Sequence, residues 1–225
     1  MLARFRSSFS DRRIAVVASL AVLSLFVLTM MLARVVYTET LEHTWIAWNL
    51  FLAWVPFVLS LVAYARARPG MSGARVLALG GLWLLFFPNA PYIVTDLKHI
   101  GGSSGVGVPI LYDVLLLSAA AWTGLLLGLA SLFLMHAVAR RFIGVLNAWM
   151  LVIGVLAASS FGIYLGRFQR WNSWDVFLRP GSLLGQATQG LHARPLALTV
   201  LLTSFLLASY LVFYSFARMS ALIRE

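Results

Sequence analysis

The chain has 225 residues, of which 61% are hydrophobic and only 11% are charged, and its mean hydropathy is +0.91. Soluble proteins carry about 25% charged residues, so this composition excludes an ordinary soluble domain. The net charge of +10 is spread between apolar segments, which argues against a nucleic-acid partner, and the absence of cysteine excludes disulfides and thiolate metal sites.

Apolar runs of about 20 residues, the length that spans a bilayer, recur along the whole chain. They predict six membrane-spanning segments, near residues 14–34, 44–65, 76–94, 109–136, 143–166 and 195–217. In lipid, every backbone polar group must be bonded internally, so each segment is expected to be a helix. We therefore predict an all-α fold, a polytopic membrane helical bundle that forms a single transmembrane domain over residues 1–225.

The basic residues predict the orientation of this bundle. If the N-terminus is inside, eleven of the 17 Lys and Arg residues fall on the inner side. The positive-inside rule then places both termini in the cytoplasm. The inner connections are expected at 66–75 and 137–142, and the longer outer ones at 95–108 and 167–194.

The third segment contains two prolines, which predict a break in its helix. Pro88 and Pro91 lack the N–H donor, and each ring collides with the carbonyl four residues earlier. Asn89 is expected to satisfy the freed backbone groups or to cap a new segment that starts near Pro91.

Beyond this break, Tyr92, Asp96 and His99 have the spacing i, i+4, i+7, which puts them on one face of an α-helix. A phenol, a carboxylate and an imidazole on one face can bind a ligand or transfer protons. The alternative is a helix end with an ordinary polar cap.

Ionisable residues also occur at membrane depth in the fourth and fifth segments, where they are costly and indicate function. Asp113 lies one turn into the fourth segment, and we expect Arg167 or His99 as its partner. Arg167 and Arg170 end the fifth segment, and their guanidinium groups suit phosphate or carboxylate. The alternatives are a local role for Asp113 at its helix N-terminus and snorkelling arginines.

Two features of neighbouring segments complete the predicted site. Asn49 in the second segment contributes a polar group, or else only an interhelical hydrogen bond. The fifth segment has a stripe of small residues, Ala158, Gly162 and Gly166, that allows close packing of another helix. Most acidic residues fall on the outer side, the loop with Glu42 and His43 is expected to be solvated, and the inner halves of the segments look apolar.

The chain resembles an uncharacterised family of bacterial integral membrane proteins, a domain of unknown function. The motifs that carry the resemblance are WNLFLAWVP at 48–56, FFPNAPYIVTDL at 86–97, Tyr112-Asp113, GIYLGRF at 162–168 and RWNSWD at 170–175. The resemblance implies a multi-helix protein of the bacterial cytoplasmic (inner) membrane, and it implies no activity.

Residue chemistry predicts a polar site at the outer membrane face. The favoured function is an intramembrane enzyme, an acyltransferase or hydrolase, that acts on a membrane lipid or a lipid-linked anionic substrate. The residues expected to be catalytic are His99, Asp96 and Asp113, with His99 as general acid or base. The residues expected to bind substrate are Asn49, Asn89, Tyr92, Tyr164, Arg167, Arg170 and Asp175.

Three alternatives remain open at this point. A metal variant would use Asp96 and His99 with Asp113 or Asp175, although the chain has no HExxH motif. A transporter or channel for a small solute or ion would use the broken third segment. A non-catalytic scaffold would use the charged residues only to hold helices together. No motif identifies a cofactor.

Overall fold

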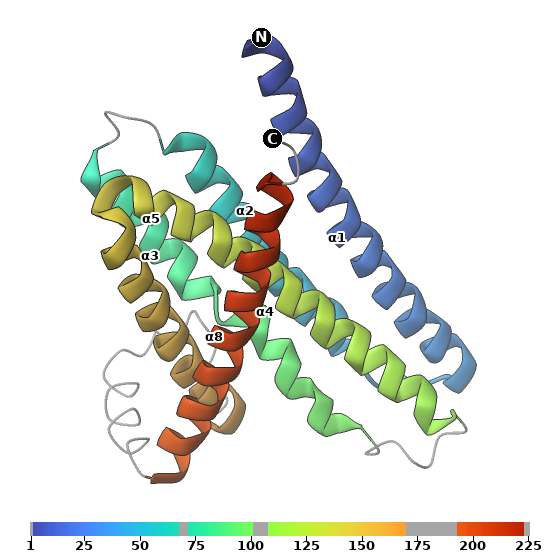
Figure 1. Cartoon of the computed structure of the whole chain (residues 1–225). Helices are drawn as coiled ribbons and strands as arrows, with labels where there is room; N and C mark the ends of the chain where they lie inside the picture. Colours follow the sequence, from blue (N-terminus) through green and yellow to red (C-terminus); the bar gives the residue numbers. More distant parts are fainter. Residues whose placement is uncertain (1, 68–71, 101–107, 170–192, 223–225) are drawn as a thin grey trace.

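The structure, a computed structural model, describes residues 2–67, 72–100, 108–169 and 193–222, all of them in helices or short connections. The elements in chain order are α1 (Leu2–Thr38), α2 (Trp45–Arg66), α3 (Gly73–Phe86), α4 (Asn89–Tyr92), the 3-10 helix η1 (Ile93–His99), α5 (Ile110–Gln169) and α8 (Ala193–Leu222) (Figure 1). The prediction of an all-α fold is confirmed for these residues.

Five helical stretches of the described chain are long and apolar enough to cross a membrane. They are Ile14–Thr38, Trp45–Arg66, Gly73–His99, Ile110–Phe168 and Pro195–Met219. Both the fourth and the fifth predicted segments lie within α5, which is 60 residues long.

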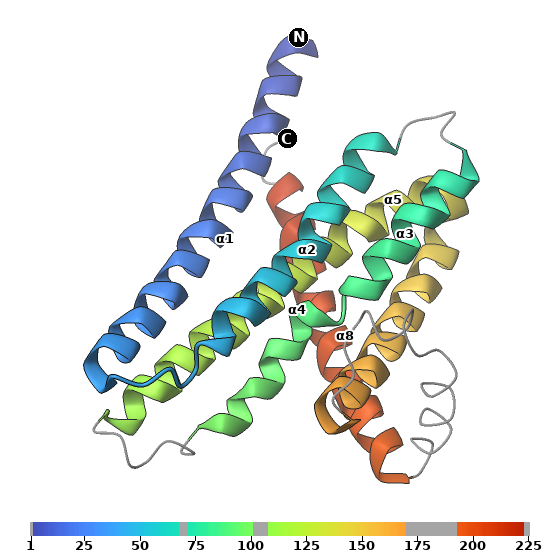
Figure 2. The same ribbon diagram turned by 180° about the vertical axis from the view of Figure 1, so that it is seen from behind.

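Helix α5 consists of two arms that meet at Gly144. This residue has φ 79° and ψ 176°, a conformation that glycine adopts readily because it has no Cβ. The first arm runs from one end of the molecule to the other, and the second arm runs back beside it (Figures 1 and 2). The predicted connection at 137–142 is therefore wrong. Those residues contain no helix breaker and continue the first arm.

The first arm of α5 is the centre of the bundle. A buried cluster joins it to α1 and α2, and a second cluster joins α3, both arms of α5 and α8. A buried polar link also holds α2, α3 and α5 together. Trp83 Nε1 donates to Ser131 Oγ at 2.7 Å, and Ser131 donates to the carbonyl of Pro56 at 2.9 Å.

The predicted break in the third segment is present, and its backbone groups are satisfied locally. Helix α3 ends at Phe86, and Asn89 Nδ2 donates to the Phe86 carbonyl at 2.9 Å, as the sequence predicted for this side chain. The short α4 then crosses close to α5. A Cβ on Gly124 would lie 2.7 Å from the carbonyl oxygen of Ala90. The predicted stripe of small residues on the fifth segment does not make such a close approach. A Cβ on Gly162 would meet the Pro88 ring only at ordinary contact distance.

The start of α1 and the end of α8 lie at the same end of the bundle (Figure 1). The end of α1, the starts of α2 and α5, and η1 lie at the opposite end (Figure 2). This opposite end, called the η1 end below, holds the ionisable residues that the sequence singled out.

Candidate functional site

Helices α2, η1 and α5 meet around a buried carboxylate, Asp96. Asn49 Nδ2 donates to Asp96 Oδ2 at 2.9 Å, and Arg167 Nη1 donates to Asp96 Oδ1 at 2.8 Å. Asp96 is 2% exposed. Both of its oxygens are thus occupied, by an amide from α2 and a guanidinium from α5, and such charge-assisted bonds are among the strong ones in proteins.

The guanidinium of Arg167 is fixed by three groups of α4 and η1. Besides the carboxylate, it donates from Nη1 to Tyr92 Oη at 3.2 Å and from Nη2 to the Thr95 carbonyl at 3.0 Å. Its side chain is 11% exposed, and its Nε has no hydrogen-bond partner among the described residues. We call Asn49, Tyr92, Thr95, Asp96 and Arg167 the Asp96 cluster.

His99 does not join the Asp96 cluster as the sequence predicted. Residues 93–99 form a 3-10 helix, so the α-helical spacing that placed Tyr92, Asp96 and His99 on one face does not apply. His99 is exposed and contacts the Trp45 ring, with centroids 5.3 Å apart. Lys98 beside it is also exposed.

Asp113 belongs to a second charged cluster, and its partner is neither Arg167 nor His99. Arg34 donates from Nε to Asp113 Oδ1 at 2.7 Å and from Nη2 to Oδ2 at 3.3 Å. Nη2 also lies 3.3 Å from Glu42 Oε2. The Arg34 side chain is completely buried. This residue ends the first apolar segment, and the sequence signal for it was a cation at membrane depth.

The connection between α1 and α2 is solvated as predicted at Glu39 and Glu42, which are exposed, but not at His43. His43 is 4% exposed, with φ 67°, and neither ring nitrogen has a partner among the described residues. Burial lowers the pKa of His43 and the Arg34 guanidinium lowers it further, while Asp113 and Glu42 oppose this effect. We call Arg34, Glu42, His43 and Asp113 the Arg34 cluster.

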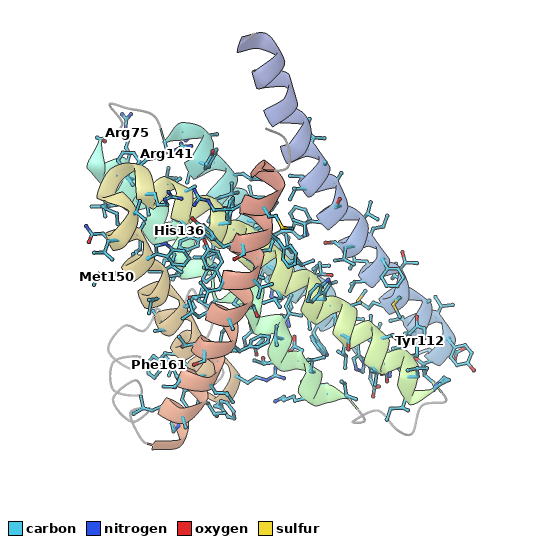
Figure 3. The ribbon with its side chains drawn as sticks, viewed as in Figure 1. Arg75, Tyr112, His136, Arg141, Met150 and Phe161 are labelled. Atoms are coloured by element: carbon cyan, nitrogen blue, oxygen red, sulfur yellow. The ribbon has the colours of Figure 1, made fainter. Side chains whose placement is uncertain are left out.

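Aromatic rings connect the Arg34 cluster to His99. The His43 and Trp45 ring centroids are 5.9 Å apart, and Trp45 in turn contacts His99. Tyr112, next to Asp113, donates to the Met30 carbonyl at 2.6 Å and marks this end of the molecule in Figure 3.

The remaining predicted site residues have different positions. Tyr164 lies between Phe161 and Phe168, with ring centroids 6.4 and 5.0 Å away, and the Asn89 side chain donates to the Phe86 carbonyl. Arg170 and Asp175 lie outside the described residues. Within the described ranges, no group of three or more His, Asp or Glu side chains is arranged to hold a metal ion.

The opposite half of the bundle is not uniformly apolar, which corrects another prediction. His136 is 2% exposed, and its Nδ1 lies 2.8 Å from Tyr210 Oη (Figure 3). Trp149 and Tyr214 pack against the same imidazole at 4.6 and 5.5 Å between centroids. These side chains join both arms of α5 to α8. Histidine and tyrosine within long apolar runs were the sequence signal for this cluster.

A family model described as a protein of unknown function (DUF1361) matches residues 48–209. The chain belongs to this family. The resemblance to an uncharacterised domain family is thereby confirmed. The DUF1361 match contains Asn49, Asp96, Asp113 and Arg167 but not Arg34 and His43. No curated protein and no solved structure matches the chain.

Proposed function

We propose that this DUF1361 protein crosses the bacterial inner membrane six times, with the η1 end on the extracytoplasmic side. The two arms of α5 then count as separate crossings, and the common end of α1 and α8 is cytoplasmic. The described arginines near that end, Arg66, Arg75, Arg140, Arg141 and Arg218, support this orientation through the positive-inside rule.

We further propose that the Asp96 cluster binds the anionic head group of a membrane lipid or a lipid-linked molecule. The observation that carries the proposal is the fixed guanidinium of Arg167. Asp96, Tyr92 and Thr95 hold it in one orientation, while Nε keeps an unused donor. Arginine presents a planar fork that matches phosphate, and fixing the fork in advance reduces the entropy lost on binding.

Charge on η1 supports an anionic ligand. Lys98 and His99 lie two and three residues after Asp96 and are exposed. Asp96 neutralises Arg167, so Lys98 gives the cluster an excess positive charge. We propose Asp96 as a positioning residue for Arg167, with Asn49 fixing the other carboxylate oxygen.

Catalysis by an acyltransferase or hydrolase would extend this proposal. His99 is the candidate acid or base because its imidazole is exposed near the Asp96 cluster and has no described hydrogen-bond partner that occupies it. A His99→Ala variant tests this extension. Mass spectrometry of lipids incubated with the two proteins would reveal a product made only by the wild type.

The binding proposal is tested by titrating the protein in phosphatidylcholine nanodiscs that contain increasing phosphatidylglycerol. Intrinsic tryptophan fluorescence reports occupancy, since Trp45 contacts His99. We expect Arg167→Gln to weaken binding about tenfold, since a hydrogen bond to a charged group contributes about 1.5–3 kcal/mol. Arg75→Gln, which changes an exposed arginine at the other end, is the matched control.

A scaffold role is the second candidate, favoured by the full occupancy of Asp96. In that case the Asp96 cluster only joins α2, η1 and α5. Arg167→Gln would then lower the unfolding free energy but leave phosphatidylglycerol binding equal to that of wild type, and this result would overturn the binding proposal.

A further inference from the structure

The Arg34 cluster contains three buried nitrogens without a described hydrogen-bond partner. They are Nη1 of Arg34 and both ring nitrogens of His43, and the two residues are 1% and 4% exposed. Buried polar atoms in folded proteins are nearly always paired, because an unpaired one has lost its hydrogen bonds to water without replacement. Three in one cluster indicate that the site accommodates a polar group from outside the described chain.

The backbone conformation of His43 also indicates a functional site. His43 has φ 67°, a left-handed conformation that only a few per cent of non-glycine residues adopt, histidine more often than most. Such backbone conformations are strained, and they concentrate at functional sites. The chain therefore holds a strained, buried imidazole beside a buried guanidinium.

The charges of the cluster restrict the chemistry of its ligand. Arg34 faces two carboxylates, Asp113 and Glu42, so the cluster carries a net negative charge while His43 is neutral. An anion is therefore disfavoured. A hydroxyl group fits, because it accepts a hydrogen bond from Arg34 or His43 and donates one to His43 or a carboxylate.

The Arg34 cluster is also linked through Trp45 to His99, which lies three residues after Asp96 in the sequence. Trp45 contacts His43 on one side and His99 on the other, at 5.9 and 5.3 Å between centroids. Glu42 is the partly exposed member, with 46% of its side chain accessible. Because Glu42 Oε2 also lies 3.3 Å from Arg34 Nη2, this partly exposed side chain connects the buried cluster to the surface.

We propose that Arg34, His43 and Glu42 form a subsite for the hydroxyl groups of a glycerol or sugar head group. The subsite rests on the proposed function, because the phosphate of the same lipid would lie near Arg167. The chain would thus recognise head groups that carry both a phosphate and hydroxyls, with Trp45 packed between the two parts.

Two lipids of equal charge test the subsite. Phosphatidylglycerol and phosphatidylethanol both carry one phosphodiester, but only the first has free hydroxyls. In the nanodisc titration we expect wild type to bind phosphatidylglycerol about fivefold more tightly, the effect of about one net hydrogen bond. His43→Phe should remove this preference without weakening the binding of phosphatidylethanol.

Controls keep the outcomes separate. Glu39→Gln changes an exposed acid of the same connection and should keep the preference. If His43→Phe does not fold, Glu42→Gln should still reduce the preference, because this residue is partly exposed. Arg167→Gln should weaken the binding of both lipids equally.

Two results overturn the subsite. If wild type binds both lipids equally through Arg167, the buried nitrogens hold water only, and the proposed function stands without the subsite. If neither lipid binds in an Arg167-dependent way, the proposed function falls and the subsite falls with it.

Discussion

The pair of Arg34 and Asp113 should stabilise the attachment of α1 to α5. Both side chains are buried, with 0% and 9% exposure, and two hydrogen bonds of 2.7 and 3.3 Å join them. Removing one partner of a buried ion pair costs about 3–5 kcal/mol, because a charge stays behind unpaired. Glu42 still lies 3.3 Å from Arg34, so we expect Asp113→Leu to cost about 3 kcal/mol, the lower end of this range.

The double variant Arg34→Met/Asp113→Leu separates the cost of an unpaired charge from the value of the pair. Replacing a whole buried pair by apolar side chains is often neutral. We therefore expect the double variant to recover most of the lost stability. Reversible unfolding in mixed micelles of dodecyl maltoside and dodecyl sulfate, followed by circular dichroism, measures the difference.

The exposed Glu39→Ala is the control and should stay within about 0.5 kcal/mol of wild type. The reasoning is refuted if Asp113→Leu is as stable as this control. It is also refuted if the double variant is less stable than Asp113→Leu alone.

Three further variants test other parts of the structure by the same unfolding measurement. Gly124→Ala places a Cβ 2.7 Å from a carbonyl oxygen of α4 and should cost about 1–3 kcal/mol, while Gly154→Ala, in open space, should cost nothing; equal effects would contradict the close approach. The pKa of His43 in the folded protein lies below its ordinary value of 6.5. At a pH between the folded and the unfolded pKa, the unfolded chain therefore binds more protons than the folded one. Stability should therefore fall as the pH is lowered below about 6.5, and His43→Phe should lessen this fall; an unchanged profile would exclude His43 as its source. Tyr210→Phe leaves Nδ1 of His136 buried without its 2.8 Å partner and should cost about 1–2 kcal/mol, which a wild-type unfolding curve would contradict.

Hydropathy was sufficient to predict the helical fold, because a helix is one of the few structures that hydrogen-bond every backbone N–H and C=O group within lipid. It could not locate the turn in α5. The pair Arg140-Arg141 suggested a connection, but charge does not end a helix. Gly144 does so here, because the reversal needs a positive φ and glycine adopts it at little cost.

The candidate site was predicted in part. Asp96, Arg167, Tyr92 and Asn49 come together because proline breaks α3 and directs η1 toward α2 and α5. The partner of Asp113 was missed, because the order of helices in a bundle cannot be read from apolar periodicity. Arg34 lies within the continuous helix α1, and the sequence alone did not indicate which helix its side chain would face.

The single-residue reversal at Gly144 has a consequence for biosynthesis. If both arms of α5 cross the membrane as proposed, the absence of a linker between them favours their insertion together as one helical hairpin. In the orientation proposed above, Arg140 and Arg141 would hold the tip of this hairpin on the cytoplasmic side, where synthesis takes place.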